Sequence, residues 1–175
     1  MIFTPTEFKD LFVIKREPHG DERGWFARTF AKEELQKAGL AFDIVHINQA
    51  RTQEKGTLRG LHWQTAPKEE AKIFQCLRGK IFDVAIDMRK DSPTFHKWFG
   101  VELSEDNHKM TLVPKGFAHG YQTLTEDCLV QYFVDEYYAP EVELGVMWND
   151  PAFGIDWPIK NPILSPKDQK WPMVK

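Results

Sequence analysis

Cysteines, long apolar runs and a surplus of either charge are all scarce in this sequence. The 175 residues include two cysteines, Cys76 and Cys128, each within a run typical of a buried strand, so a disulfide framework is excluded and reduced thiols are expected. No apolar run approaches the ~18 residues of a membrane span, and the N-terminus lacks a secretory signal pattern. The net charge of -3 at pH 7 excludes a surface built for nucleic acid. We therefore expect a cytoplasmic protein with no nucleic-acid or membrane partner.

Length and hydrophobic content indicate one compact domain, which we predict to cover residues 1–175. From Phe12 onward, short runs rich in Val, Ile, Phe and Tyr alternate with Gly, Pro, Asn and Asp. This spacing is typical of an all-β barrel or sandwich. A small closed barrel has an interior wide enough for one small ligand, so function is to be sought among inward-facing polar residues.

Several strands can be placed from the alternation of apolar and polar residues. The clearest covers residues 81–88, where an apolar face alternates with a second face that carries Asp83 and Asp87. Residues 73–77 precede it, and we predict that the two strands pair as a hairpin in which Gly79 supplies a positive φ. Further strands are predicted near residues 97–103, 109–113, 118–124 and 128–137. Residues 32–40 are the exception and predict one short helix.

Residues 58–64 combine the pattern of a strand with three polar side chains. His62 and Gln64 share one strand face, whereas Arg59 lies on the opposite face unless Gly60 introduces a bulge. An isolated histidine most often makes hydrogen bonds in a core. The crowding of Arg59, His62 and Gln64 instead favours a functional site.

A second histidine, His119, follows a tight turn at residues 114–117. Together His62, Gln64, Glu69 and His119 nearly fill the pattern by which many cupins hold a divalent metal. However, glutamine replaces the second histidine, and a neutral amide oxygen is a weaker ligand than imidazole for such ions. A metal-dependent cupin dioxygenase or isomerase using His62, Glu69 and His119 is therefore an alternative, and we predict no metal and no cofactor.

Seven stretches of the chain carry a resemblance to a known family, in matching order and separation. They are residues 21–26, 56–64, 87–95, 114–120, 137–140, 148–151 and 155–158. Across almost its whole length the sequence resembles the dTDP-4-dehydrorhamnose 3,5-epimerase family, metal-independent cupins acting on dTDP-4-keto-6-deoxy sugars. The resemblance implies a cupin jelly-roll β-barrel with one short N-terminal helix and short C-terminal helical turns. It also implies an isomerase of a nucleotide-linked 4-keto sugar.

Epimerisation beside a ketone requires a base, an anion stabiliser and an acid. The resemblance implies that His62 is the base, that Asp168 orients it, that Tyr132 is the acid and that Lys72 lies near the ketone oxygen. An unperturbed imidazole pKa of about 6.5 suits proton removal near neutral pH. Two ordinary interpretations stay open. Asp168 fits a turn that begins at Pro166 and is capped by Ser165, and Tyr132 fits plain strand packing.

Binding of the substrate is assigned by the same resemblance. Arg23 and Arg59 match residues that grip the nucleotide diphosphate, a task suited to the planar guanidinium. The other substrate-binding candidates are Phe26, Gln64, His119, Tyr138 and Glu143. Family members are usually homodimers in which an N-terminal segment contributes to the neighbouring site, so a homodimer is expected.

Two departures from the family pattern lie near the expected nucleotide pocket. Arg28 stands where the family usually has glutamate, and residues 48–51 differ from the usual run. A mono-epimerase at carbon 3 or carbon 5, or a ketoisomerase on a related nucleotide sugar, is therefore the nearer alternative. A non-catalytic sugar-binding cupin is a third, which the joint presence of His62, Asp168 and Tyr132 argues against.

Overall fold

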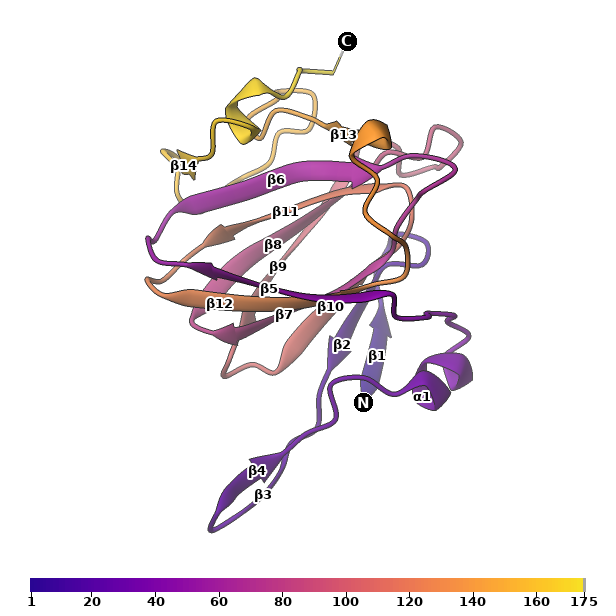
Figure 1. Ribbon diagram of the computed structural model, residues 1–175, viewed down its shortest axis with the longest axis vertical. Coiled ribbons are helices and arrows are strands. Elements are labelled where there is room, and N and C mark those ends of the chain that lie inside the picture. Colours follow the sequence, from indigo (N-terminus) through magenta and orange to yellow (C-terminus); the bar gives the residue numbers. More distant parts are fainter. Residues whose placement is uncertain (175) are drawn as a thin grey trace.

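Two facing β-sheets form the body of the protein in the computed structural model, which describes residues 1–174 (Figure 1). The first sheet contains, in spatial order, β1 (Ile2–Pro5), β2 (Phe12–Lys15), β10 (Lys109–Val113), β7 (Lys72–Arg78), β12 (Cys128–Val134) and β5 (His46–Thr52). The second contains β13 (Glu143–Gly145), β6 (Thr57–Gln64), β11 (Phe117–Thr123), β8 (Lys80–Asp87) and β9 (Trp98–Ser104). Strand β14 (Ile163–Leu164) adds to β6 in parallel, whereas the other pairings are antiparallel.

This arrangement confirms the all-β cupin jelly roll predicted from the sequence. Short helical elements also occur where they were predicted. They are α1 (Lys32–Lys37) and two 3₁₀ turns, η1 (Pro140–Val142) and η2 (Asp168–Lys170). None of the helices in residues 1–174 is long and apolar enough to span a membrane.

The predicted hairpin between β7 and β8 is wrong. Gly79 does have a positive φ of 75°, but β7 pairs with β10 and β12, while β8 pairs with β11 and β9. The chain changes sheet at Gly79, so the two strands face each other across the core. Phe74 and Cys76 of β7 pack in one cluster with Ile81 of β8. Each strand thus has neighbours on both edges of its own sheet, and the two strands bury apolar side chains between the sheets.

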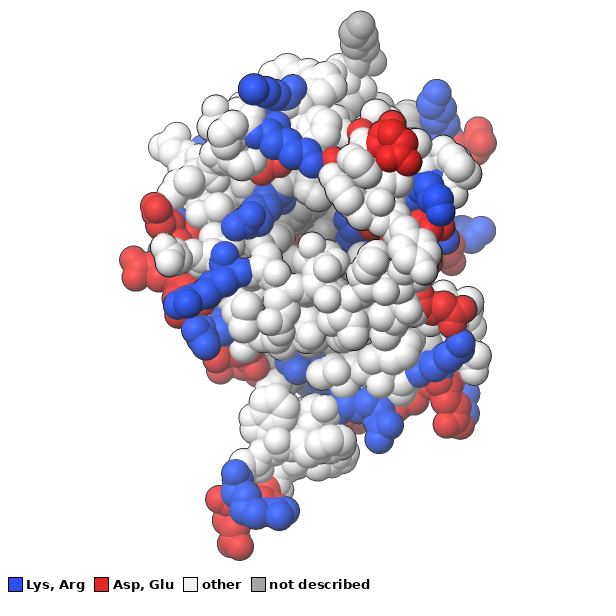
Figure 2. Space-filling model, viewed as in Figure 1, with Lys and Arg blue, Asp and Glu red and all other residues white. Residues whose placement is uncertain are grey.

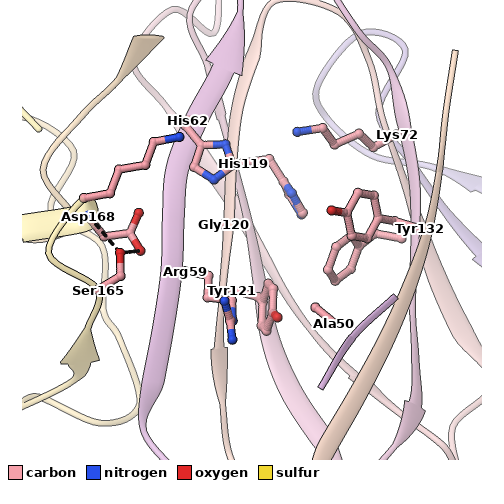
Figure 3. Close-up of a pocket in the computed structure, with 12 residues that line it drawn as sticks. Ala50, Arg59, His62, Lys72, His119, Gly120, Tyr121, Tyr132, Ser165 and Asp168 are labelled. Atoms are coloured by element: carbon pink, nitrogen blue, oxygen red, sulfur yellow. Dashed lines mark hydrogen bonds between the residues drawn. The ribbon is translucent and has the colours of Figure 1, made fainter. Parts of the chain in front are cut away.

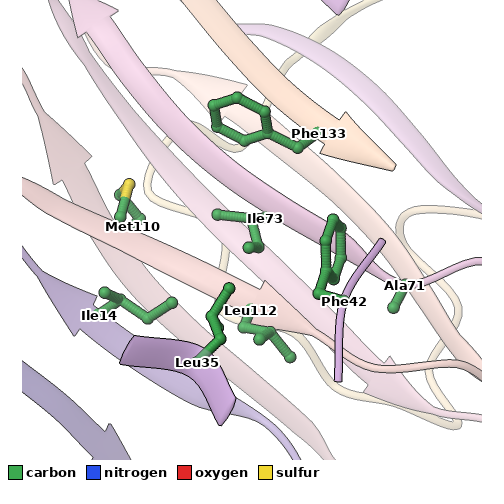
Figure 4. Close-up of a cluster of buried hydrophobic side chains, with 8 residues drawn as sticks. All are labelled: Ile14, Leu35, Phe42, Ala71, Ile73, Met110, Leu112 and Phe133. Atoms are coloured by element: carbon green, nitrogen blue, oxygen red, sulfur yellow. The ribbon is translucent and has the colours of Figure 1, made fainter. Parts of the chain in front are cut away.

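Helix α1 covers the outer face of the first sheet. Its Leu35 is buried and packs with Ile14, Ile73, Met110 and Phe133 (Figure 4). Burial of one such leucine contributes about 2 kcal/mol. The helix is also anchored by Glu34, which accepts a hydrogen bond from the chain's N-terminal ammonium at 2.6 Å. These contacts hold the segment that leads from the hairpin of residues 19–26 back to the barrel.

Strands β3 (His19–Asp21) and β4 (Gly24–Phe26) form a separate hairpin that projects away from the barrel (Figure 1). Its aromatic side chains are unusually open, with Trp25 58% exposed and Phe26 65% exposed. The hairpin therefore presents apolar surface that its own barrel does not cover.

Candidate active site

A cleft opens between the two sheets and consists of two adjoining cavities of about 270 and 460 Å³. Both cavities are lined by His62, Lys72 and Tyr132. The smaller one adds Ala50, Arg59, Phe74, His119, Gly120, Tyr121, Ser165, Lys167 and Asp168. The larger one adds His46, Asn48, Gln49, Glu70, Val134, Glu136, Tyr138 and Glu143. Figure 2 shows a hollow on this face with lysine and arginine side chains around it.

A β-bulge brings Arg59 and His62 to the same side of β6. His119 pairs with His62 and Tyr121 pairs with Arg59, so three steps along β6 oppose two steps along β11. Gly60 lies within the bulge at a φ of 110°. A Cβ atom there would lie 2.6 Å from the carbonyl oxygen of His119. The extra residue reverses the alternation of side chains along β6. Arg59 and His62 therefore share the cavity, as the sequence predicted for a bulge at Gly60.

His62 projects from β6 into the cleft and lines both cavities (Figure 3). Burial is the main cause that lowers its pKa from 6.5 to about 3, and the positive charges of Lys72, His119 and Lys167 add to the effect. One third of the side chain, 33%, is nevertheless exposed to the cavity. The ring is therefore neutral at pH 7 and has a nitrogen free to accept a proton.

Tyr132 and Lys72 lie on the wall opposite His62 (Figure 3). They come from β12 and β7 of the first sheet, whereas His62 comes from β6 of the second. Tyr132 stacks on Phe74 with ring centroids 5.3 Å apart, and burial raises the pKa of its phenol, assisted by the charge of Glu70. Lys72 Nζ lies 2.8 Å from Glu70 Oε1. The cleft thus has a proton acceptor on one wall and a protonated phenol with an ammonium group on the other.

Asp168 and Ser165 form a short hydrogen-bonded turn at the edge of the smaller cavity. The Asp168 backbone N–H donates to Ser165 Oγ at 3.1 Å, and Ser165 Oγ donates to Asp168 Oδ2 at 2.7 Å. This confirms the capped-turn interpretation. Asp168 is buried and lines the same cavity as His62, but no hydrogen bond or ion pair joins these two described residues.

The carboxylate that does approach His62 is Glu143. Its Oε1 lies 3.7 Å from His62 Nδ1, and its Oε2 accepts hydrogen bonds from Lys167 Nζ at 2.6 Å and from the Tyr138 hydroxyl at 3.2 Å. Sequence reasoning placed Glu143 and Tyr138 near the substrate but missed Lys167. A single lysine in a segment without strand or helix periodicity gives no pattern that could have revealed it.

His119 is held in the wall of the cleft by a buried polar chain. Its Nε2 lies 2.8 Å from Asp83 Oδ1, and Thr111 donates to Asp83 Oδ2 at 2.7 Å. The ring also packs edge-on against Phe74, with centroids 4.8 Å apart. The position of the His119 imidazole is therefore fixed on both sides.

Three predicted substrate contacts do not reach the cleft of this chain. Gln64 is buried; its Nε2 donates to the carbonyl oxygens of Lys68 and Tyr137, and its Oε1 accepts from the backbone N–H of Ala139. In this chain the Gln64 amide therefore holds the surrounding backbone together, and its contact with the substrate stays a prediction. Arg23 and Phe26 lie on the projecting hairpin, where the Arg23 guanidinium pairs with Asp21.

Two further sets of residues bear on the alternatives. In the part of the chain that the structure describes, no group of three His, Cys, Asp or Glu side chains is arranged to hold a metal ion. The set His62, Glu69 and His119 is thus not assembled. Of the residues that depart from the family pattern, Asn48 and Gln49 line the larger cavity, whereas Arg28 is exposed outside both.

Comparison with known proteins gives matches along the whole chain. The profile described as dTDP-4-dehydrorhamnose 3,5-epimerase matches residues 5–175. The enzyme of that name from Shigella flexneri is 40% identical over 164 residues, which are 93% of this chain and 90% of the relative. The crystal structure of the Bacillus anthracis enzyme with TDP and PPi bound superposes with a TM-score of 0.97 at 44% identity, covering 99% of each chain. The Legionella pneumophila enzyme in complex with dTDP-4-keto-L-rhamnose gives 0.93 at 38% identity, covering 98% of this chain and 92% of that one.

A jelly-roll barrel with this cleft, matched over its full length by such relatives, is an isomerase of the cupin fold. The chain belongs to the dTDP-4-dehydrorhamnose 3,5-epimerase family.

Proposed function

We propose that the protein inverts carbons 3 and 5 of dTDP-4-dehydro-6-deoxy-D-glucose and so forms dTDP-4-dehydro-L-rhamnose. The observation that carries this proposal is the pairing of a neutral His62 on one wall of the cleft with a protonated Tyr132 on the other. Inversion at carbon needs a proton removed from one face and returned to the opposite face. Two proton-transfer groups on facing walls supply that requirement.

In the proposed reaction His62 takes the proton from a carbon next to the C4 ketone, and the C–H electrons move to the ketone oxygen. The ammonium of Lys72 stabilises the resulting enolate. Tyr132 then delivers a proton to the other face of the carbon. The tyrosinate takes a proton from water, and the His62 imidazolium releases its proton to the solvent, so both groups are restored. Glu70 supports the role of Lys72, because the ion pair between them holds the Lys72 ammonium at the cavity wall.

The diphosphate is assigned to the part of the smaller cavity lined by Arg59. The Arg59 Nε donates to Thr52 Oγ1 at 3.2 Å, which leaves the remaining guanidinium N–H groups for phosphate oxygens. Lys167 lines the same cavity and adds a second cation. The ligands named for the relatives, TDP and dTDP-4-keto-L-rhamnose, support a dTDP-linked substrate.

A homodimer is part of the proposal because it would bring Arg23 and Phe26 to the cleft of a second copy, where they could contact its substrate. Both lie on the projecting hairpin, outside the cleft of their own chain. A second copy whose cleft receives this hairpin would cover the exposed Trp25 and Phe26. We also place the protein in the cytoplasm.

The experiment is to incubate the purified protein with dTDP-4-keto-6-deoxy-glucose and to identify the product by its proton NMR ring couplings. Inversion at both carbons supports the proposal. Inversion at carbon 3 or carbon 5 alone would make the protein a mono-epimerase with the same base. An unchanged sugar would contradict both.

A further inference from the structure

Glu143 is shared by three polar groups at the junction of the two cavities. Strand β13 pairs with β6 so that Gly145 lies opposite His62, and this register holds Glu143 beside the histidine. The Glu143 side chain is only 10% exposed. In this arrangement its negative charge is matched by Lys167 at 2.6 Å, whereas His62 is more distant at 3.7 Å.

Lys167 differs from Lys72 and His119, the other basic side chains around His62, in its exposure to solvent. Lys72 is nearly buried and held by Glu70, and His119 is buried and held by Asp83. Lys167 is 51% exposed, and its ammonium group is held by one carboxylate, Glu143, and lies over the Trp171 ring, 5.5 Å from the ring centroid. Because it also lines the cavity that contains Arg59, it lies where a diphosphate would compete for its ammonium group.

Competition between a diphosphate and Glu143 for Lys167 would change the charge around His62 and therefore its pKa. The titratable and charged groups that line the two cavities around His62 are Lys72, His119, Lys167, Arg59, Tyr121, Tyr132, Asp168, Glu143, Glu70, His46, Glu136 and Tyr138. Burial, and then the neighbouring basic groups, lower the pKa of His62, so the unliganded site has a weak base. General bases act best when their pKa lies near the working pH, and a nearby uncompensated carboxylate raises the pKa of an imidazole.

We propose that Lys167 is a clamp that releases Glu143 when a diphosphate binds. Lys167 exchanges Glu143 for phosphate oxygens beside Arg59, and the freed Glu143 carboxylate then pairs with His62 Nδ1. The substrate thereby strengthens the base that attacks it. Glu143 acts as a positioning residue that stabilises the imidazolium formed when the α-proton reaches the other ring nitrogen. This inference rests on the proposed function, because it takes the nucleoside diphosphate as the ligand.

The test is a ¹⁵N NMR titration of the His62 imidazole between pH 8 and pH 4.5, with and without dTDP. Four proteins are compared, namely wild type, Lys167→Met, Glu143→Gln and the control Lys170→Met, which removes an exposed lysine from the same segment. We expect His62 to stay neutral throughout the titration of unliganded wild type. Either dTDP binding to wild type or the Lys167→Met substitution alone should raise its pKa by roughly one to three units.

The variants separate the clamp from a general effect of charge. In Lys167→Met, dTDP should add no comparable rise, and in Glu143→Gln it should cause none, whereas Lys170→Met should behave as wild type. An unliganded Lys167→Met protein whose His62 still does not titrate would overturn the proposal. So would an equal rise with dTDP in wild type and Lys167→Met. If dTDP changes no signal at all, the nucleotide part of the proposed function fails, and the unliganded comparison still decides the clamp.

Discussion

Substitution of Gly60 by alanine tests whether the bulge in β6 holds Arg59 and His62 in the cleft. The new Cβ would lie 2.6 Å from the His119 carbonyl oxygen and 2.7 Å from Gly120 Cα, at a φ of 110°. Two other glycines separate these effects. Gly120→Ala meets the Arg59 carbonyl oxygen at 2.6 Å without a positive φ, and Gly39→Ala has a φ of 77° with nothing within 4 Å.

The expected losses in the free energy of unfolding follow from these contacts. Gly39→Ala should cost about 1 kcal/mol, because only the left-handed backbone is disfavoured. Gly60→Ala combines backbone strain of roughly 1–3 kcal/mol with steric overlap of similar size, so a loss on the order of 4 kcal/mol is expected. Gly120→Ala should lie between them. A domain with a typical stability of about 5–15 kcal/mol survives such a loss.

Urea denaturation gives the three stabilities, and steady-state epimerisation gives the effect on the site. Separation of β6 from β11 moves Arg59 and His62 together, and a displacement of about 1 Å can lower kcat roughly 100-fold. Gly39→Ala should keep wild-type kcat. The reasoning fails if Gly60→Ala is no less stable than Gly39→Ala and retains full activity.

Two further predictions concern pH. Because burial and neighbouring positive charges lower the pKa of His62, kcat/KM should not fall between pH 7 and pH 5 through protonation of this residue, and an acid limb with a midpoint near 6.5 would contradict the assignment. For Asp87, burial alone would raise the pKa, but hydrogen bonds from Arg89, Ser92 and Thr94 hold it at about 2, below its ordinary 3.8. The carboxylate therefore adds at most about 2 kcal/mol of stability above pH 4, which is lost as the pH falls towards 2. In urea titrations the stability difference between wild type and Asp87→Asn should shrink over that range, and a constant difference would refute the argument.

Much of the fold could be predicted because the information is local or shared with the family. Alternation of side chains along residues 81–88 identified β8, and the matched stretches identified the jelly roll. The hairpin between β7 and β8 could not be judged correctly, since a glycine with positive φ serves equally well at a hairpin turn and at a corner between sheets. The choice between these two turns depends on the packing of Phe74 and Ile81 in one buried cluster between the sheets. That packing depends on the whole fold and has no local sequence signal.

Most of the predicted residues that line the cleft lie on strands, with Asp168 and Tyr138 contributed by turns and loops, whereas Lys167 was missed. His62, Lys72, Tyr132 and His119 lie on the cleft wall because their strands fix them there. The shared strand face of His62 and Gln64 did not place Gln64 in the cavity, because its amide satisfies loop backbone groups that have no sequence signature.

The contact between Lys167 and Glu143 is of the same kind as the Gln64 contacts. It joins a C-terminal segment to β13, and neither residue type nor spacing predicts the pair. The roles of Arg23 and Phe26 depend on a second copy and stay predictions.

The central claim is that His62 removes the proton beside the ketone. It is tested most directly by proton NMR in deuterated water, following the loss of the signals at carbons 3 and 5 of dTDP-4-keto-6-deoxy-glucose. We predict exchange at both carbons with wild type and none with His62→Ala, whose retained fold is checked by circular dichroism. Undiminished exchange in a folded His62→Ala protein would contradict the account.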